Sequence, residues 1–277
     1  LIHARLHPPA EKRPSNTVRV YNPNSDTLTT SDPWPASPAR IPGGYAVYNN
    51  KLYIFGGYTS IGGDQEFADT WRFDPMAPSG QKWTQITSAN LGTARYGIAG
   101  ATLNGYVYAI GGNVASGSPA SVVTPVTAVE RMNPSDANPT WQAVASLPYP
   151  RGDMGAWAYD TGTGYEISGR ILAAGGGYPV PDAQAYLYDP ASNSWAFFTE
   201  MMRPRRNYAY AQLNGMLYAF GGYNVTVNGY WGLFDGDNDS QRYDASGPPP
   251  PSIITPTSTP SPTPTSRARS RRRCTRW

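Results

Sequence analysis

The chain has 277 residues, 13% of them aromatic, with 29 glycines and 28 prolines, a composition typical of one large domain built from short strands and many turns. No apolar run approaches the ~18 residues that cross a membrane as a helix, so a membrane span is not expected. The single cysteine, Cys274, excludes a disulfide within the chain.

The net charge of +3 comes from the C-terminal end of the chain. Six of the 22 basic residues are arginines in the last eleven positions, and the remaining 16 basic residues stand against 19 acidic ones. The body of the chain is therefore slightly acidic, and we expect no nucleic-acid partner.

In chain order, residues 1–16 are expected to be irregular, and two short strands follow within residues 17–30. The segment Tyr21-Asn22-Pro23 and the later Leu28 resemble degraded versions of a pattern that recurs further along the chain. We interpret residues 17–30 as a partial blade that contains two outer strands.

The dominant feature is a unit that recurs four times, with an arginine followed by an apolar run and a Gly-Gly pair. In three copies the first glycine follows the arginine by sixteen residues, and in the copy that begins at Arg151 by twenty-four. The pairs of arginine and glycines are Arg40 with Gly56-Gly57, Arg95 with Gly111-Gly112, Arg151 with Gly175-Gly176, and Arg205 with Gly221-Gly222. A fixed internal period of this kind indicates a repeat architecture.

Each unit is expected to begin with an antiparallel β-hairpin, because its apolar residues alternate with period two. Asn49-Asn50, Asn104-Gly105 and Asn214-Gly215 suit two-residue turns, whose central residues need positive φ. The third join, from Asp160 to Arg170, is longer and accounts for the eight additional residues of that unit.

A variable loop, a third strand and a tryptophan at the start of a fourth strand complete the pattern. Phe73 precedes Trp83, Met132 precedes Trp141, and Tyr188 precedes Trp195. Four strands per unit, with a large aromatic in the outer strand, are typical of a propeller blade. We therefore predict an all-β fold.

The succession of apolar run, Gly-Gly, aromatic residue and tryptophan resembles the kelch repeat, over residues 17–244. The resemblance implies a kelch-type β-propeller with four recognisable four-stranded blades, starting near residues 40, 95, 151 and 203, plus the partial N-terminal blade. The fourth blade lacks its outer strand, and kelch rings usually have six or seven blades, so we expect an incomplete or truncated propeller. Phe73, Met132 and Leu28 depart from the family pattern.

Beyond the repeats, residues 245–266 form a Pro/Thr/Ser-rich segment that cannot build a core and is expected to be an extended linker. Residues 267–277 form a basic tail, which we expect to be disordered. Pro-Thr tracts resemble the linkers of secreted or surface proteins, and we expect an extracellular or cell-surface location, with a cytoplasmic one as the alternative.

The repeated arginines are candidate binding residues, because each stands at the start of an innermost strand, near the mouth of the propeller channel. Arginine suits bidentate recognition of carboxylates, and some kelch adaptors that bind acidic peptides use arginines at this position. The alternative is that these arginines hydrogen-bond neighbouring loops. The four candidates are Arg40, Arg95, Arg151 and Arg205.

Three long segments, 58–69, 113–126 and 223–239, are expected to be loops on the same face, where binding residues commonly lie. The third contains Tyr230 and Trp231, which could stack on sugars or peptides or fold back onto the last blade. It also spaces Asp235, Asp237 and Asp239 as calcium loops do, but the glycine and glutamate of a complete loop are missing, which favours a solvated turn.

We expect a non-enzymatic scaffold that binds a protein, an acidic peptide or a glycan, with no cofactor. Kelch-like copper oxidases need histidine ligands, and His3 and His7 precede the first strand. The alternative function is a carbohydrate-active propeller, either a sugar epimerase or a lectin-like module, in which Asp153 or Glu130 would serve as an acid or base.

Overall fold

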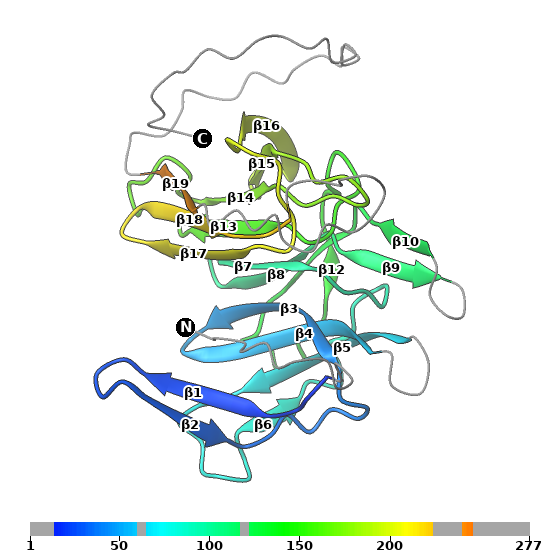
Figure 1. Ribbon diagram of the computed structural model, residues 1–277, viewed down its shortest axis with the longest axis vertical. Helices are drawn as coiled ribbons and strands as arrows, with labels where there is room; N and C mark the ends of the chain where they lie inside the picture. The colour runs from blue at the N-terminus through cyan, green and yellow to red at the C-terminus, as the bar shows by residue number, and fades with distance from the viewer. Residues whose placement is uncertain (1–13, 60–64, 117–121, 224–239, 246–277) are drawn as a thin grey trace. The chain divides into compact units, whose positions relative to one another are not determined.

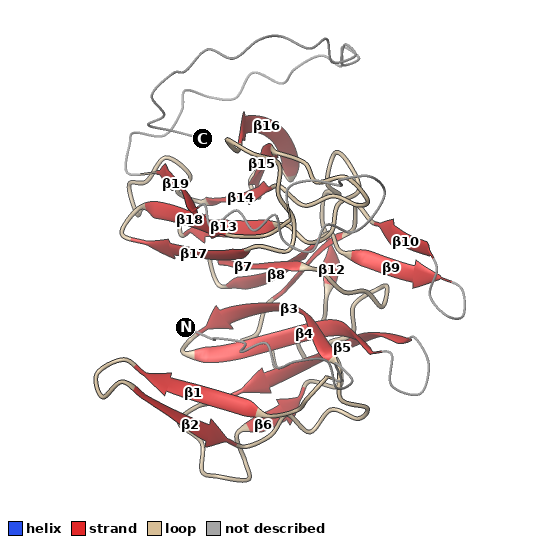
Figure 2. Ribbon diagram, in the orientation of Figure 1, coloured by secondary structure: helices blue, strands red, loops and turns tan. Residues whose placement is uncertain are grey.

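The computed structural model describes residues 14–59, 65–116, 122–223 and 240–245. Every regular element among these residues is a β-strand, and none is a helix (Figure 2). The chain divides into two compact units, residues 1–152 and residues 153–277.

The first unit contains two four-stranded antiparallel sheets, each a blade of the predicted kind (Figure 1). Its first blade has the order β3-β4-β5-β6, with β3 (Ile41–Tyr48), β4 (Lys51–Thr59), β5 (Gln65–Phe73) and β6 (Trp83–Gln85). Its second has the order β7-β8-β11-β12, with β7 (Ala99–Leu103), β8 (Tyr106–Ile110), β11 (Val129–Met132) and β12 (Gln142–Ala143).

Two separate hairpins complete the first unit. The N-terminal one pairs β1 (Val18–Asn22) with β2 (Thr27–Ser31), which are the two strands expected of the partial blade. The other pairs β9 (Asn113–Ser116) with β10 (Val122–Pro125) and lies between the second and third strands of the second blade.

The second unit contains one four-stranded sheet and one with three strands among the described residues. The third blade consists of β13 (Gly155–Tyr159), β14 (Arg170–Ala174), β15 (Gln184–Asp189) and β16 (Ser194–Glu200). The fourth blade consists of β17 (Ala209–Leu213), β18 (Met216–Phe220) and β19 (Ser240–Asp244). The described residues include no fourth strand of this blade, so its expected lack of an outer strand stays a prediction.

The turns follow the chemistry that the sequence predicts. Asn49 and Asn50 have φ of 47° and 59°, and Asn104-Gly105 and Asn214-Gly215 have positive φ at both positions. The insertion between β13 and β14 also lies where expected, and it places Ile167 and Tyr165 against the core of the second unit.

For two of the three segments expected to be loops the prediction is wrong, because the structure has β-strands within them. Residues 113–126 contain the β9–β10 hairpin, and in segment 58–69 the ladder of β4 and β5 continues to the pair Thr59 and Gln65. The consecutive residues Val122, Val123 and Thr124 favour extended structure, because β-branched side chains suit a pleated ladder. The third expected loop lies largely outside the described residues.

Each unit has a core formed between its two blades. In the first unit, Phe55 of β4 packs edge-on against Trp141 at 5.1 Å between ring centroids, and the Trp141 indole donates to Thr70 Oγ1 of β5. In the second unit, the Trp157 indole of β13 donates to the carbonyl of Ala211 in β17. Aromatic side chains therefore join neighbouring blades through both apolar area and a hydrogen bond.

Candidate functional site

The repeated arginines join successive blades through their backbone. The amide of the second glycine in a blade donates to the carbonyl of the arginine that begins the next blade. This bond occurs from Gly57 to Arg95 (3.0 Å), from Gly112 to Arg151 (2.8 Å) and from Gly176 to Arg205 (2.8 Å). We call it the glycine–arginine bond between blades.

A second backbone bond fixes each of the same arginines. The arginine amide donates to a carbonyl of the preceding blade, near the start of that blade's third strand. The partners are Phe67 for Arg95 (3.2 Å), Val126 for Arg151 (3.1 Å) and Asp182 for Arg205 (3.2 Å). Both backbone groups of Arg95 and of Arg205 are thus used in joining the two blades of one unit.

The arginine side chain turns back to its own blade, which explains the offset of sixteen residues. Arg95 Nε donates to the Gly111 carbonyl at 2.9 Å, and Arg205 Nη1 donates to the Gly221 carbonyl at 2.7 Å. Arg95 also forms a 2.7 Å ion pair with Glu130 of β11, and its side chain is fully buried. A buried guanidinium requires such partners, because an isolated buried charge is strongly unfavourable.

Arg40 departs from this arrangement. Both carboxylate oxygens of Asp69 in β5 accept from its Nη2 at 2.7 Å, and its guanidinium lies 3.8 Å from the Phe67 ring centroid and 4.9 Å from that of Trp34. The first blade therefore replaces the glycine carbonyl with a carboxylate and two aromatic rings.

The structure buries all four predicted arginines, and the side chains of Arg40, Arg95 and Arg205 bind groups of their own units. Arg40, Arg95 and Arg151 lie in the first unit and Arg205 in the second. Recognition of an external ligand by these residues stays a prediction. Tyr230, Trp231, Asp235, Asp237 and Asp239 lie outside the described residues, and within the described ranges no group of three or more His, Cys, Asp and Glu side chains is placed to hold a metal.

The two carboxylates considered as an acid or base are both ion-paired. Glu130 pairs with Arg95 and also accepts from the Gly92 amide at 2.8 Å. Asp153 pairs with Arg206 at 3.3 Å, with both side chains buried, and its φ of 61° lies in the left-handed region that few residues other than glycine, asparagine and aspartate adopt.

The tyrosines beside the glycine pairs form a feature that the sequence analysis did not single out. Tyr58 follows the first Gly-Gly pair and packs against Tyr96, with ring centroids 5.0 Å apart. In the second unit the Arg206 guanidinium lies 5.0 Å from the Tyr178 ring centroid and 5.6 Å from that of Tyr223. These four rings are half-buried, and their places directly after the glycines or the arginines were the available signal.

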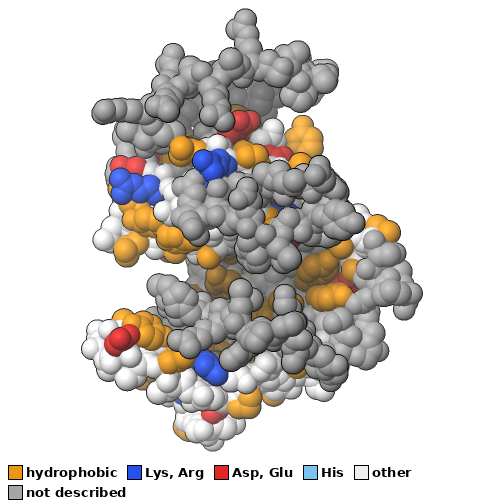
Figure 3. Space-filling view, viewed as in Figure 1, with side chains coloured by type: hydrophobic (Ala, Val, Ile, Leu, Met, Phe, Trp, Pro, Cys, Tyr) orange, Lys and Arg blue, Asp and Glu red, His pale blue; other side chains and the backbone are white. Residues whose placement is uncertain are grey.

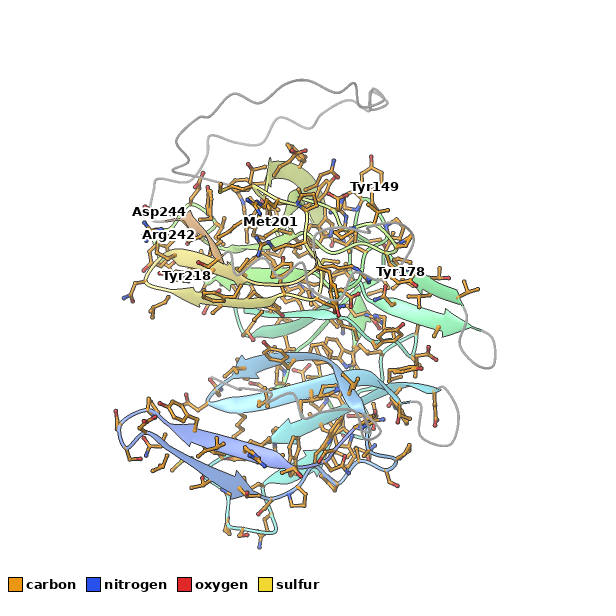
Figure 4. The ribbon with its side chains drawn as sticks, viewed as in Figure 1. Tyr149, Tyr178, Met201, Tyr218, Arg242 and Asp244 are labelled. Carbon is orange, nitrogen blue, oxygen red and sulfur yellow. The ribbon has the colours of Figure 1, made fainter. Side chains whose placement is uncertain are left out.

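A tyrosine–arginine pair recurs across the second and third strands of three blades. The register pairs Tyr53 with Arg72, Tyr108 with Arg131, and Tyr218 with Arg242, whose labels lie close together in Figure 4. The third blade has the apolar pair of Leu172 and Leu187 instead.

Burial affects the ionisation of two of these tyrosines. Desolvation raises the pKa of Tyr53 and of Tyr108, although the nearby arginine in each pair acts in the opposite direction.

Four-stranded antiparallel sheets with aromatic contacts between successive sheets define a β-propeller. Comparison with known proteins agrees, since a solved structure titled "Structure of YjhT" superposes with a TM-score of 0.54 at 15% identity, covering 71% of this chain and 63% of that one. A profile of the Kelch motif matches residues 39–90, which span the first blade. The chain thus contains a kelch motif and has the fold of a kelch-type β-propeller.

Its curated relatives carry kelch names. Kelch-like protein 25 of Xenopus tropicalis is 24% identical over 77% of this chain, and Kelch repeat and BTB domain-containing protein 13 of Homo sapiens is 32% identical over 49%. A putative F-box/kelch-repeat protein of Arabidopsis thaliana is 25% identical over 80%. The matches span 33%, 26% and 58% of these relatives' own lengths.

Kelch-repeat proteins are typically scaffolds for protein interactions, and the fold of this chain is consistent with non-enzymatic binding. Among the described residues no helix is long and apolar enough to span a membrane.

Proposed function

We propose that this chain is a non-enzymatic scaffold that binds a protein partner through the ends of its blades that carry the Gly-Gly pairs. The observation that carries the proposal is the cluster of Tyr178, Arg206 and Tyr223 in the second unit. Two half-buried tyrosine rings flank a buried guanidinium, and Asp153 holds that guanidinium in place. Tyrosine and arginine in such surroundings are the residues that most often dominate binding energy at protein interfaces.

Charge favours an acidic segment as the partner's contact. Three arginines occur within the four residues 203–206. A carboxylate of the partner would gain from that surplus of positive charge, and tyrosine rings supply contact area at a low cost in side-chain entropy.

The ion pairs of Glu130 and Asp153 support binding rather than catalysis. A general acid or base must exchange a proton with a substrate, and each of these carboxylates is instead committed to an arginine of its own unit. This engagement disfavours the alternative of a sugar epimerase that would use either residue.

The test uses the full chain, a panel of acidic peptides and a panel of mono- and oligosaccharides, with binding followed by biolayer interferometry. We expect acidic peptides to bind, and Tyr178→Ala and Tyr223→Ala each to weaken binding by about tenfold or more, as loss of an interface anchor does. Tyr21→Ala is the matched control, because Tyr21 is an exposed tyrosine in the separate β1–β2 hairpin. Unchanged peptide affinity in both test variants would contradict the proposed surface, and turnover of any sugar would contradict a purely binding role.

An extracellular or cell-surface location is part of the same proposal. Its support is the composition of residues 245–266, because Pro/Thr/Ser-rich segments are common between domains of surface proteins. Fractionation of the source cells tests it, and recovery of the protein only in the cytoplasm would contradict it.

A further inference from the structure

The eight additional residues of the third blade belong to an ordered segment. Residues 160–170 include the connection between β13 and β14, where each of the other three blades has a two-residue turn. Within this segment the Ser168 amide donates to the Tyr165 carbonyl at 2.9 Å, and at its base the Gly169 amide donates to the Tyr159 carbonyl at 2.8 Å. These bonds give the segment a fixed shape of its own, and we call residues 160–170 the strap.

The strap reaches the fourth blade and holds the end of β19. The Glu166 amide donates to the Ala245 carbonyl at 2.7 Å, and the Tyr243 hydroxyl donates to Glu166 Oε2. Tyr243 is 3% exposed, and a buried phenol needs a polar partner for its hydroxyl. Glu166 therefore binds this strand end through both its backbone and its side chain.

Further contacts join the strap to β18 and to the turn before it. Ile167 of the strap is fully buried in the hydrophobic core that also contains Leu217 of β18. The Tyr165 ring packs against the Tyr159 ring with centroids 4.4 Å apart, and the Tyr159 hydroxyl accepts from the Gly215 amide at 3.1 Å. The strap is thus attached to this end of the fourth blade by apolar as well as polar contacts.

The alternation of β19 explains why Tyr243 faces the strap. Gln241 and Tyr243 are each 3% exposed, whereas Arg242 between them is exposed, because successive side chains of a strand point to opposite faces. Arg242 and Asp244 are labelled in Figure 4, and Figure 3 shows charged side chains at the surface at this end of β19. The side of β19 that carries Tyr243 is the side that the strap binds.

β18 connects the strap to the tyrosine–arginine cluster of the proposed binding surface. The ladder of β18 and β19 ends, away from the strap, at the pair Phe220 and Ser240. The glycine pair follows Phe220, and Tyr223 then exchanges two backbone hydrogen bonds with Arg206, at 3.0 and 2.8 Å. A five-residue strand such as β18 is about 17 Å long, so the strap and the cluster lie at opposite ends of one ladder.

We propose that the strap is a conformational lock, which holds β19 in the fourth blade and thereby keeps Tyr223 and Arg206 in place at the other end of β18. The strands of one blade share a backbone ladder and a core, so freeing the strap end of β19 lowers the free energy needed to open the rest of the blade. An event that opens the strap would then alter the cluster without contacting it. The inference rests on contacts within the second unit and does not depend on which partner the cluster binds.

The experiment measures amide hydrogen exchange of the full chain, residue by residue, in the wild type and in two variants. Tyr243→Phe keeps the ring and removes the hydroxyl bond to Glu166. In the second variant Asn-Gly replaces residues 160–169, which gives the third blade the turn of the second and fourth blades. In both variants we expect the amides of β19, Arg206 and Tyr223 to exchange about tenfold faster or more, as loss of a hydrogen bond to a carboxylate allows. Far-UV circular dichroism and the melting temperature establish that each variant is folded.

Tyr188→Phe is the matched control. Tyr188 is 1% exposed, and its hydroxyl donates to Asn193 Oδ1 at 2.9 Å, so this variant loses a tyrosine hydroxyl bond that stays within the third blade. Its amides at Arg206 and Tyr223 should exchange as in the wild type. Exchange in Tyr243→Phe that matches this control would overturn the proposal. Faster exchange confined to β19 would overturn it too, because the strap would then be a local brace. If the strap replacement does not fold, Tyr243→Phe alone decides between these outcomes.

Discussion

The amide of Gly57 donates to the carbonyl of Arg95 at 3.0 Å, and this bond joins the first blade to the second. The close approach depends on the glycine pair, because a Cβ on Gly56 would lie 2.5 Å from the same carbonyl oxygen. Arg95 then binds Gly111 of its own blade through its side chain. The arginine and the Gly-Gly pair that recur in the sequence are therefore parts of one connection between blades.

This connection predicts a difference between two glycines of similar conformation. Gly56→Ala should lower the free energy of unfolding of its unit by roughly 2–4 kcal/mol, because the new methyl group adds a backbone clash to the cost of positive φ. Gly221→Ala carries only the second cost, roughly 1 kcal/mol, because a Cβ at Gly221 would meet nothing within 4 Å. Urea unfolding of the two variants measures both losses, and equal losses would contradict the role given to the Arg95 carbonyl.

The ion pair of Arg95 and Glu130 should be much more important for stability than an exposed one. Glu130→Gln leaves the fully buried guanidinium without a neutralising charge, and we expect a loss of roughly 3 kcal/mol. Asp74→Asn is the control, because Asp74 pairs with Lys51 at 2.9 Å on the surface, where solvent screens the interaction.

Chemical denaturation of the two variants provides the measurement. The Asp74→Asn control should unfold at a denaturant concentration close to that of the wild type. A Glu130→Gln variant as stable as the control would show that the buried charge is compensated by other groups.

Alkaline pH should destabilise the fold through its buried tyrosines. Desolvation raises the pKa of Tyr108, so the folded state favours the neutral phenol. Stability from this residue is fully present below the ordinary tyrosine pKa of about 10. It falls as pH rises from there toward the folded-state pKa, because the unfolded chain ionises first.

The matching variant is Tyr108→Phe, which should lessen the loss of stability above about pH 10. Melting temperatures from pH 7 to 11.5, with tyrosinate absorbance recorded in parallel, provide the measurement. An identical decline in the variant and the wild type would assign the alkaline effect to other groups.

The fold was largely predictable from local sequence. Asn104-Gly105 and Asn214-Gly215 specify their turns through backbone preference alone, and alternation specifies the hairpins that they join. The β9–β10 hairpin was missed, because a short apolar run between variable residues is a weak signal for a strand.

The candidate site was less predictable, since burial and ion pairing depend on residues distant in the chain. The spacing identified Arg95 as important, but nothing local showed that Glu130, on another strand, would neutralise it. Likewise, the tyrosines that flank Arg206 come from two different blades.

Amide hydrogen exchange at the second glycine of each pair tests the central claim, that a glycine–arginine bond joins successive blades. The account predicts that the Gly57, Gly112 and Gly176 amides exchange as slowly as core strand amides such as that of Ala109, while the Gly222 amide, which makes no glycine–arginine bond within the described residues, exchanges much faster. Fast exchange at Gly57, Gly112 and Gly176, at rates like that of Gly222, would contradict it.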